Sequence, residues 1–305
     1  MIITLVLLCV IATVAFPGKF ATSQNLSQIL LNLSIDTIVA VGMMVLMIAG
    51  VFDLSVGSIV AFSGGLAGYL MYYHNTYFLL AVGVALAGSV LIGWLNGYLV
   101  AKIGINPLIQ TLAMMGVVRG ITLMLSGSGI QNFPYKFIFI GQSKFLGLQA
   151  PIWYMLVTLL IFSFLMNNSA FFRQYYFLGS NEKAAFLSGM RVDRLKIWVF
   201  VLSAFLAGLA GILLTSRLDA ALSTSGKGLE LRVITAVILG GASLQGGQGK
   251  IWGAFLGAAF MGVINNILII SRVSGYWQEV ILGLILIIAV GADSMVSRGR
   301  GEGRG

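Results

Sequence analysis

Charged residues are scarce in this chain of 305 residues, since Asp, Glu, Lys and Arg together make up 9% of it. Soluble globular proteins carry about 25% charged residues, so this chain cannot cover a water-exposed surface of its size. The scarcity excludes a cytosolic enzyme, a nucleic-acid-binding domain and a disordered chain. With 59% hydrophobic residues and a mean hydropathy of +1.00, the composition indicates a polytopic membrane protein.

Side chains that ligate metals or act as nucleophiles are also nearly missing. The chain has one cysteine, Cys9, and one histidine, His74. An intrachain disulfide, a cysteine metal site and a histidine cluster are therefore all excluded. We expect no catalytic residues, no metal and no cofactor held by this chain, and we do not expect an enzyme.

Apolar runs are what the chain has in abundance. A membrane helix needs about 20 apolar residues. About ten spans are predicted on this basis: 1–16, 34–51, 57–73, 78–101, 107–126, 151–168, 197–216, 232–245, 251–271 and 276–292. The run 232–245 is too short to span unless it is tilted or broken. The run 1–16 lacks the charged n-region of a signal peptide, which favours a truncated first membrane helix.

The net charge of +9 comes from 18 basic and 9 acidic residues, and the basic ones lie mostly between apolar runs. In a membrane protein such residues indicate orientation, because cytoplasmic loops are enriched in Lys and Arg. The loop 169–196 holds Arg173, Lys183, Arg191, Arg194 and Lys196. With ten spans, this loop and the C-terminal tail fall on one side. We expect both termini in the cytoplasm of a bacterial inner membrane, and no nucleic-acid partner.

Glycine is frequent, with 39 residues, many at spacings such as Gly253 and Gly257 that let helices approach closely. The stretches 51–58 and 240–249 differ, because they interrupt apolar regions, and irregular backbone at membrane depth needs protein or water around it. Residues 93–97 and 262–266 resemble each other on helices that run in opposite directions. Together these features suggest a five-plus-five inverted repeat; chance similarity is the competing explanation.

Polar side chains within or beside the spans are the candidates for a translocation path: Asp53, Ser55, Asn96, Asn106, Asn265 and Asn266. Intramembrane polar groups usually face protein or water. Asparagine also joins helices through side-chain hydrogen bonds, and for Asn96, Asn265 and Asn266 both roles stay open. For Asp53 we rank first the capping of a helix that begins near Ser55.

Two loops carry further signals. In the basic loop, Asn181 predicts the N-cap of a helix over about 182–188, and Gly189 predicts its end. Residues 184–187 give this helix an apolar side, so it either lies on the bilayer or inserts into a partner's groove; the residues alone slightly favour the bilayer. The external segment 127–150 is rich in Phe and Tyr, which favours an interfacial aromatic belt over a docking surface.

Five stretches stand in a defined order along the chain: Phe52–Ser58, Asn106–Leu112 with Arg119 and Gly120, Gly179–Met190, Leu229–Leu231 running into Gly240 and Gly241, and Ser243–Gly249. In this order they resemble the membrane subunits of ATP-binding-cassette importers of the ribose/galactose/xylose type, over roughly residues 35–293. The resemblance implies an all-α polytopic membrane protein with one transmembrane permease domain, residues 1–293. The tail 294–305 is expected to be disordered.

The resemblance also implies a mechanism. Two such subunits, as a homodimer or with a paralogue, form the pore for a monosaccharide such as ribose and work by alternating access. A separate ATP-binding subunit hydrolyses ATP, in agreement with the absence of a GxxxxGK[ST] loop here, and an external solute-binding protein delivers the sugar. The residues that match the ATPase-coupling helix are Asn181, Glu182, Ala184, Ala185, Ser188 and Gly189. The alternatives are a permease for a nucleoside, amino acid or other small polar solute, and a stand-alone secondary transporter.

The chain departs from the family's usual pattern in several places. Val51 and Phe52 stand where glycines usually precede Asp-Leu-Ser, and the N-terminus lacks the usual basic arm. Arg232 stands where the family usually has Asp after Glu-Leu. This exchange puts a permanent cation near the outer mouth, and the sequence alone does not explain it.

Overall fold

The computed structural model describes the backbone of residues 1–302 and their side chains except those of 292 and 294–302. Its helices are α1 (Ile2–Ala15), α2 (Ser23–Ile48), α3 (Val56–His74), α4 (Phe78–Tyr98), the π-helical turn η1 (Leu99–Ile103), α5 (Pro107–Ser126), α6 (Tyr135–Gln142), α7 (Ala150–Asn168), α8 (Ala170–Ser180), α9 (Glu182–Leu187), α10 (Val192–Leu218), α11 (Leu229–Leu239), α12 (Ile251–Ile270) and α13 (Gly275–Glu302). The predicted disorder of the tail 294–305 concerns residues whose side chains, and from 303 also the backbone, lie outside the described part.

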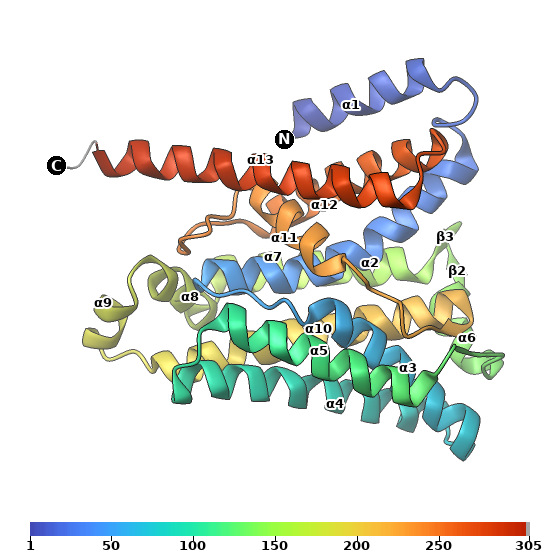
Figure 1. Ribbon diagram of the computed structural model, residues 1–305, viewed down its shortest axis with the longest axis horizontal. Coiled ribbons are helices and arrows are strands. Elements are labelled where there is room, and N and C mark those ends of the chain that lie inside the picture. The colour runs from blue at the N-terminus through green and yellow to red at the C-terminus, as the bar shows by residue number, and fades with distance from the viewer. Residues whose placement is uncertain (303–305) are drawn as a thin grey trace.

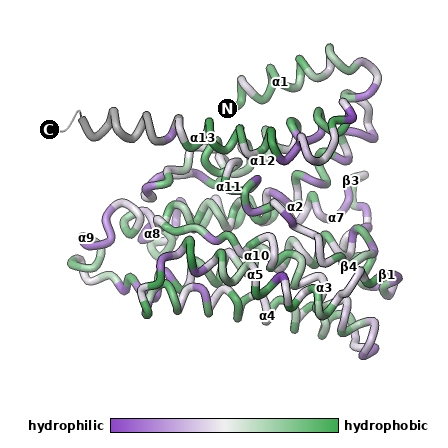
Figure 2. The backbone as a smooth tube through the Cα atoms, in the orientation of Figure 1, coloured by the Kyte–Doolittle hydropathy of each residue, from purple (hydrophilic) through white to green (hydrophobic). Residues whose placement is uncertain are grey.

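The helices form an elongated bundle with α8 and α9 at one end and four short strands at the other (Figure 1). We call these the α9 end and the strand end. Among the described residues, seven helices are long and apolar enough to cross a membrane: α2, α3, α4 with η1, α5, α7, α10 and α12. Figure 2 shows hydrophobic residues along the lengths of the helices and hydrophilic residues around α9 and near the strands. The predicted all-α membrane fold is confirmed.

Several predicted spans differ from the observed helices. The run 232–245 is not a span, because α11 ends at Leu239 and residues 240–250 form non-helical turns. The run 34–51 was placed too far along the chain: α2 begins at Ser23, where the Oγ1 atom of Thr22 accepts the N–H of Asn25 at 3.2 Å. A hydropathy reading misses this polar first turn. The first apolar run forms α1, whose 14 residues are shorter than a full span.

The two halves of the chain share one pattern of breaks and contacts. A non-helical segment, residues 49–55, separates α2 from α3, and another, residues 219–228, separates α10 from α11. Helix α10 packs against α3 and α4, while α2 packs against α11 and α12. Likewise α3 packs against α4 and α5, while α11 packs against α12 and α13. The related helices run in opposite directions along the bundle (Figure 1), as the proposed five-plus-five inverted repeat requires.

Close helix packing accounts for glycines within the spans. A Cβ atom on Gly211 of α10 would lie 2.1 Å from the carbonyl oxygen of Val60 on α3. A Cβ atom on Gly257 of α12 would lie 1.8 Å from the carbonyl oxygen of Ala236 on α11. Neither position has room for a side chain, so the predicted role of small residues at helix contacts is confirmed here.

The aromatic segment at the strand end is only partly what the sequence predicted. Strand β1 (Ile130–Gln131) pairs with β4 (Ala220–Ala221), and β2 (Lys144–Phe145) pairs with β3 (Leu148–Gln149), both antiparallel. Phe133 and Phe137 are buried within the chain, so they cannot belong to an interfacial belt. Tyr135, Phe139 and Phe145 are exposed, as a belt or a docking surface would need.

Candidate functional site

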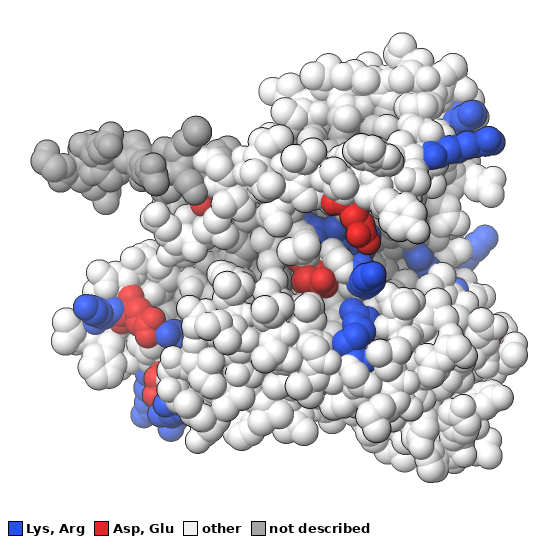
Figure 3. Space-filling view, in the orientation of Figure 1, with Lys and Arg blue, Asp and Glu red and all other residues white. Residues whose placement is uncertain are grey.

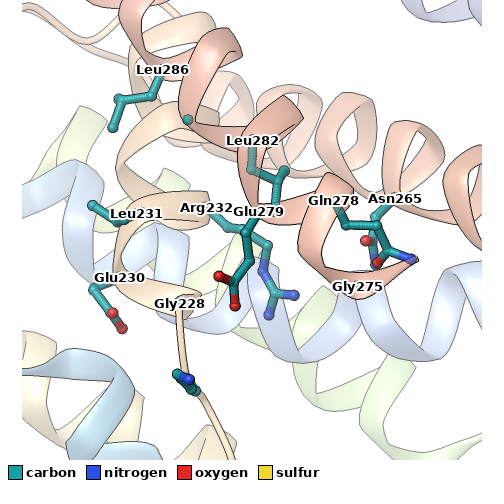
Figure 4. A pocket seen from close by; sticks show the side chains of 12 residues that line it. Gly228, Glu230, Leu231, Arg232, Asn265, Gly275, Gln278, Glu279, Leu282 and Leu286 are labelled. Carbon is teal, nitrogen blue, oxygen red and sulfur yellow. The ribbon is translucent and has the colours of Figure 1, made fainter. Parts of the chain in front are cut away.

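A charged cleft opens between α11, α13 and the segment that precedes α11. Its volume is about 580 Å³. The lining carries charges of both signs, from Lys227, Glu230, Arg232 and Glu279. It also includes the uncharged amide of Asn265 on α12. Figure 3 shows charged side chains gathered in a hollow near the middle of this face, amid a mostly uncharged surface, and Figure 4 shows Arg232 and Glu279 extending toward the same space while Glu230 points elsewhere. Such a concentration of charge is unusual in an apolar bundle and marks a functional site.

A second hollow of about 190 Å³ adjoins the first, because Arg232 and Asn265 line both. Here Arg232 Nη2 lies 3.8 Å from Asp36 Oδ1 of α2, and Arg217 Nη2 of α10 donates to Asn32 Oδ1 at 3.0 Å. Arg232, unexplained from the sequence, is therefore the charge partner of Asp36. The Nε atom of Arg232 and the Nη1 atom of Arg217 are buried and have no hydrogen-bond partner among the described residues.

Glu230 lies where the two broken halves meet. A Cβ atom on Gly57 would lie 2.2 Å from Glu230 Oε2 and 2.4 Å from the carbonyl oxygen of Gly226. The carboxylate therefore sits at the N-terminal end of α3, where the partial positive charge of the helix favours an anion. Its Oε2 atom is buried without a hydrogen-bond partner in the described part of the chain.

Arg119 of α5 fixes the segment that carries Glu230. Its Nη1 atom donates to the carbonyl oxygens of Ser223 at 2.6 Å and Ser225 at 2.8 Å, and its charge interacts with that of Glu230. The backbone before α11 is non-helical and needs such donors to satisfy its carbonyl groups inside a bilayer. Arg119 belongs to one of the stretches that carry the family resemblance, yet its role was not visible without the structure.

Asp53, Ser55 and Asn96 form one buried cluster away from the charged cleft. Asp53 Oδ1 accepts the backbone N–H of Ser55 at 2.7 Å and its hydroxyl at 2.5 Å. Asn96 Nδ2 donates to Ser55 Oγ at 3.0 Å, and Gln110 Nε2 donates to Asn96 Oδ1 at 3.2 Å. Asp53 thus holds the residue that precedes α3, close to the capping role we predicted. The three predicted path residues are fully buried and bonded to one another.

The other three predicted path residues have separate surroundings. Asn265 lines both hollows. Asn266 exchanges two side-chain hydrogen bonds with Asn25 of α2, at 3.0 and 2.7 Å, and so joins helices. Asn106 is the N-cap of α5 and accepts the N–H of Leu108 at 2.9 Å. Of the six candidates, only Asn265 faces the cleft directly.

The predicted helix in the basic loop is confirmed as α9. Asn181 Oδ1 accepts the N–H of Ala184 at 3.0 Å, and Gly189 ends the helix with a φ of +81°. Ala185, one of the residues that match the coupling helix, is 3% exposed, because that side of α9 packs against its own chain. Phe186 and Leu187 are 69% and 84% exposed. From the sequence these two residues are known only as part of the apolar side of the helix, and their exposure is visible only in the structure.

A junction of glycines holds the base of α9 in place. The N–H of Gly247 donates to the carbonyl oxygen of Ile48 at 2.9 Å. A Cβ atom on Gly179, one residue before the end of α8, would lie 1.9 Å from that same oxygen and 2.5 Å from Gly247 N. Tyr176 Oη donates to the carbonyl oxygen of Gly249 at 3.0 Å, and burial raises the pKa of this phenol, so it stays a neutral donor. The glycine junction (Ile48, Gly179 and Gly247) therefore ties α2, α8 and the 240–250 loop together.

Comparisons with known proteins agree with this architecture. The family described as branched-chain amino acid transport system / permease component matches residues 25–290. The ribose import permease protein RbsC of Haemophilus influenzae is 37% identical over 298 residues, which cover 96% of this chain and 91% of that protein. The L-arabinose ABC transporter permease protein AraH of Azospirillum brasilense is 39% identical, over 94% of this chain and 85% of its own.

A third relative, the D-allose transport system permease protein AlsC of Escherichia coli K12, is 37% identical over 92% of this chain and 87% of its own. The resemblance inferred from five short stretches is thus confirmed along nearly the whole chain. The match takes in the seven long spans except the first turn of α2, both hollows and α9. The chain therefore belongs to this family of membrane transport permease components.

Proposed function

We propose that the chain is the permease subunit of an ATP-binding-cassette importer that carries a monosaccharide. The observation that carries the proposal is the charged cleft with its adjoining hollow. Sugar hydroxyls both donate and accept hydrogen bonds, and the hollows are lined by groups of both kinds: guanidinium donors of Arg217 and Arg232, and carboxylate acceptors of Asp36 and Glu279. The printed names of three relatives mention ribose, L-arabinose and D-allose, which supports a pentose or hexose.

The cleft lies open along one side of the subunit (Figure 3). A second permease subunit, identical or paralogous, would close it into a path between the two copies. An external solute-binding protein would deliver the sugar at the strand end. Because the strand end then faces outward, the α9 end and the C-terminal end of α13 lie in the cytoplasm of the inner membrane, in keeping with the basic loop 169–196.

Helix α9 is positioned to receive force from an ATP-binding subunit. Its Glu182 Oε1 lies 2.6 Å from Lys196 Nζ of α10. One turn earlier on α10, Asp193 Oδ2 lies 2.6 Å from Lys102 Nζ of η1, which continues α4. A displacement of α9 is therefore passed to α10 and then to α4, which bears Asn96. Closure of the ATPase subunits would in this way alternate the access of the cleft.

The test is co-purification and uptake with a Leu187→Asp variant. We expect the substitution to abolish association with the ATP-binding subunit and ATP-driven uptake of labelled ribose, arabinose or allose, because it puts a charge on an exposed apolar contact residue. Leu146→Asp is the matched control: Leu146 is 77% exposed but lies at the strand end. This control should keep full association with the ATPase.

Three results would contradict the proposal. Normal association of the Leu187→Asp protein would refute the coupling role of α9. Uptake by the purified chain alone, driven by an ion gradient and independent of ATP, would favour a secondary transporter. Labelled leucine is included among the solutes because the family description mentions branched-chain amino acids, and exclusive leucine uptake would replace the sugar.

A further inference from the structure

A groove at the α9 end borders the proposed ATPase contact, because Ser188 and Gly189, which follow α9, form part of its lining. It has a volume of about 520 Å³ and runs between α8 and α10. Arg191 and Arg194 line it from α10, and Phe171 and Gln174 line it from α8. Trp198 lies seven residues after Arg191, so the two arginines and the tryptophan share one face of the helix.

The arginines of this groove are not neutralised by the protein. Neither Arg191 nor Arg194 has an acidic partner or a hydrogen-bond acceptor for its guanidinium among the described residues. The nearby carboxylates are already engaged, Asp193 with Lys102 and Glu182 with Lys196, at 2.6 Å in each pair. The N-terminus of α10 lies at the same place and adds partial positive charge. The groove is therefore a site of uncompensated positive potential.

The position of the groove along α10 indicates where it lies relative to the membrane. Arg191 directly precedes the membrane-spanning α10, and Trp198 follows two turns into it with 57% of its surface exposed. Phe171, at the start of α8, is 41% exposed. Tryptophan side chains concentrate at the boundary between headgroups and acyl chains. The cations thus lie at the water end of the groove and the aromatic rings at its hydrocarbon end.

We infer that this groove binds the headgroup of an anionic phospholipid. The phosphate accepts hydrogen bonds from the two guanidinium groups, and the acyl chains lie along Trp198 and Phe171. Basic pockets between transmembrane helices recognise such headgroups. A protein partner fits less well, because the exposed apolar side chains of α9, Phe186 and Leu187, line a different groove, where we place the ATPase contact. The lipid groove shares with that contact only Ser188 and Gly189, which follow α9.

The test is native mass spectrometry of the full chain released from detergent mixed with phosphatidylglycerol or phosphatidylcholine of the same acyl chains. Wild-type protein should retain phosphatidylglycerol preferentially. The Arg191→Gln/Arg194→Gln protein should retain about thirtyfold less of it, since each of the two basic residues near a membrane surface contributes about 1 kcal/mol. Arg191→Lys/Arg194→Lys should keep most of the binding, which separates charge from folding. Arg173→Gln, on an exposed arginine of α8 outside the groove, should bind as wild type.

Fluorescence provides a second readout. Brominated phosphatidylglycerol should quench wild-type protein more than the Trp198→Phe protein, and more than brominated phosphatidylcholine does. Equal retention of the two lipids, or an equal loss in Arg173→Gln, would overturn the inference. Unchanged lipid retention in the glutamine variant with a loss of ATPase association in lipid-free detergent would reassign the groove to a protein partner. Displacement by millimolar inorganic phosphate without any lipid preference would also overturn it.

Discussion

Asn96 is the residue on which the buried polar cluster depends. Its amide donates to Ser55 Oγ and accepts from Gln110, so one side chain satisfies partners on two different elements. A side chain with only donors or only acceptors cannot do both. Removing it leaves buried polar groups unpaired in a region that water does not reach.

We predict that Asn96→Ala lowers the free energy of unfolding by about 1–3 kcal/mol, the cost of leaving buried polar groups unsatisfied. Thermal unfolding in detergent measures the effect. Asn168→Ala is the control, because Asn168 is exposed and bonds only to the carbonyl oxygen of Phe164 one turn earlier in its own helix. An equal loss of stability in both variants would show that the buried polar cluster stabilises the protein no more than a single exposed hydrogen bond does.

Local residue roles were predictable where the partner is close in sequence. Asn181 caps α9 through the N–H of Ala184, three residues away, and any short-range reading finds this. The role of Arg232 was not predictable, because its partner Asp36 lies on α2, far away in the sequence. The burial of Ala185 was missed for the same reason: which side of α9 faces the chain depends on α8 and α10, whose packing no local pattern encodes.

At the scale of elements, the glycine junction determines where α9 stands. Gly179, Ile48 and Gly247 meet through backbone atoms, so the ends of three elements are fixed within hydrogen-bond distance of one another. A side chain at Gly179 would separate them. The coupling helix would then lose its anchored base while remaining correctly folded itself.

Gly179→Ala is predicted to reduce ATP-driven uptake strongly and to destabilise the protein by about 1–3 kcal/mol, the usual cost of overpacking. The control is Gly83→Ala in α4, where a Cβ atom meets nothing within 4 Å. Both glycines are helical, so both alanines gain the same helix propensity, and the difference in thermal stability reports the junction alone. Identical melting temperatures for the two variants would show that the glycine junction does not stabilise the protein.

Helix existence was predictable from apolar run length, and helix ends were not. The polar first turn of α2 and the eleven-residue α11 both defeat a window of about 20 apolar residues. Such short or interrupted helices occur where backbone at membrane depth is satisfied by other groups, as Arg119 does for Ser223 and Ser225. The failure at α11 therefore falls beside the cleft.

For the whole molecule, the inverted repeat was visible only faintly in sequence, as the likeness between 93–97 and 262–266. In the structure, the contacts among α2–α5 and α10–α13 match one another, in keeping with that hypothesis over four helices of each half. The two halves of such a repeat need to share only the positions of their helix breaks and the packing of their helices. Corresponding side chains can differ, because they lie in different surroundings in the two halves. Asn96 is buried in a cluster, while Asn265 lines the cleft.

The proposed orientation of the molecule in the membrane can be tested by cysteine labelling. In a Cys9→Ser background, Lys144→Cys at the strand end should react with a membrane-impermeant maleimide added to intact spheroplasts. Lys183→Cys on α9 should react only after the membrane is opened, because we place α9 in the cytoplasm. Both side chains are exposed, so accessibility within the protein is matched. The reverse labelling pattern would invert the proposed topology.

Helix α2 enters the bilayer early in synthesis, yet it keeps almost no surface for lipid, since 83% of its most apolar window is buried. The helices that cover it, α7, α10, α11 and α12, are made more than a hundred residues later. Until then α2 is a lipid-soluble helix without neighbours. Biogenesis must therefore proceed in two steps, insertion followed by lateral assembly. A chain stalled before α10 would leave α2 exposed to lipid and to membrane quality-control proteases.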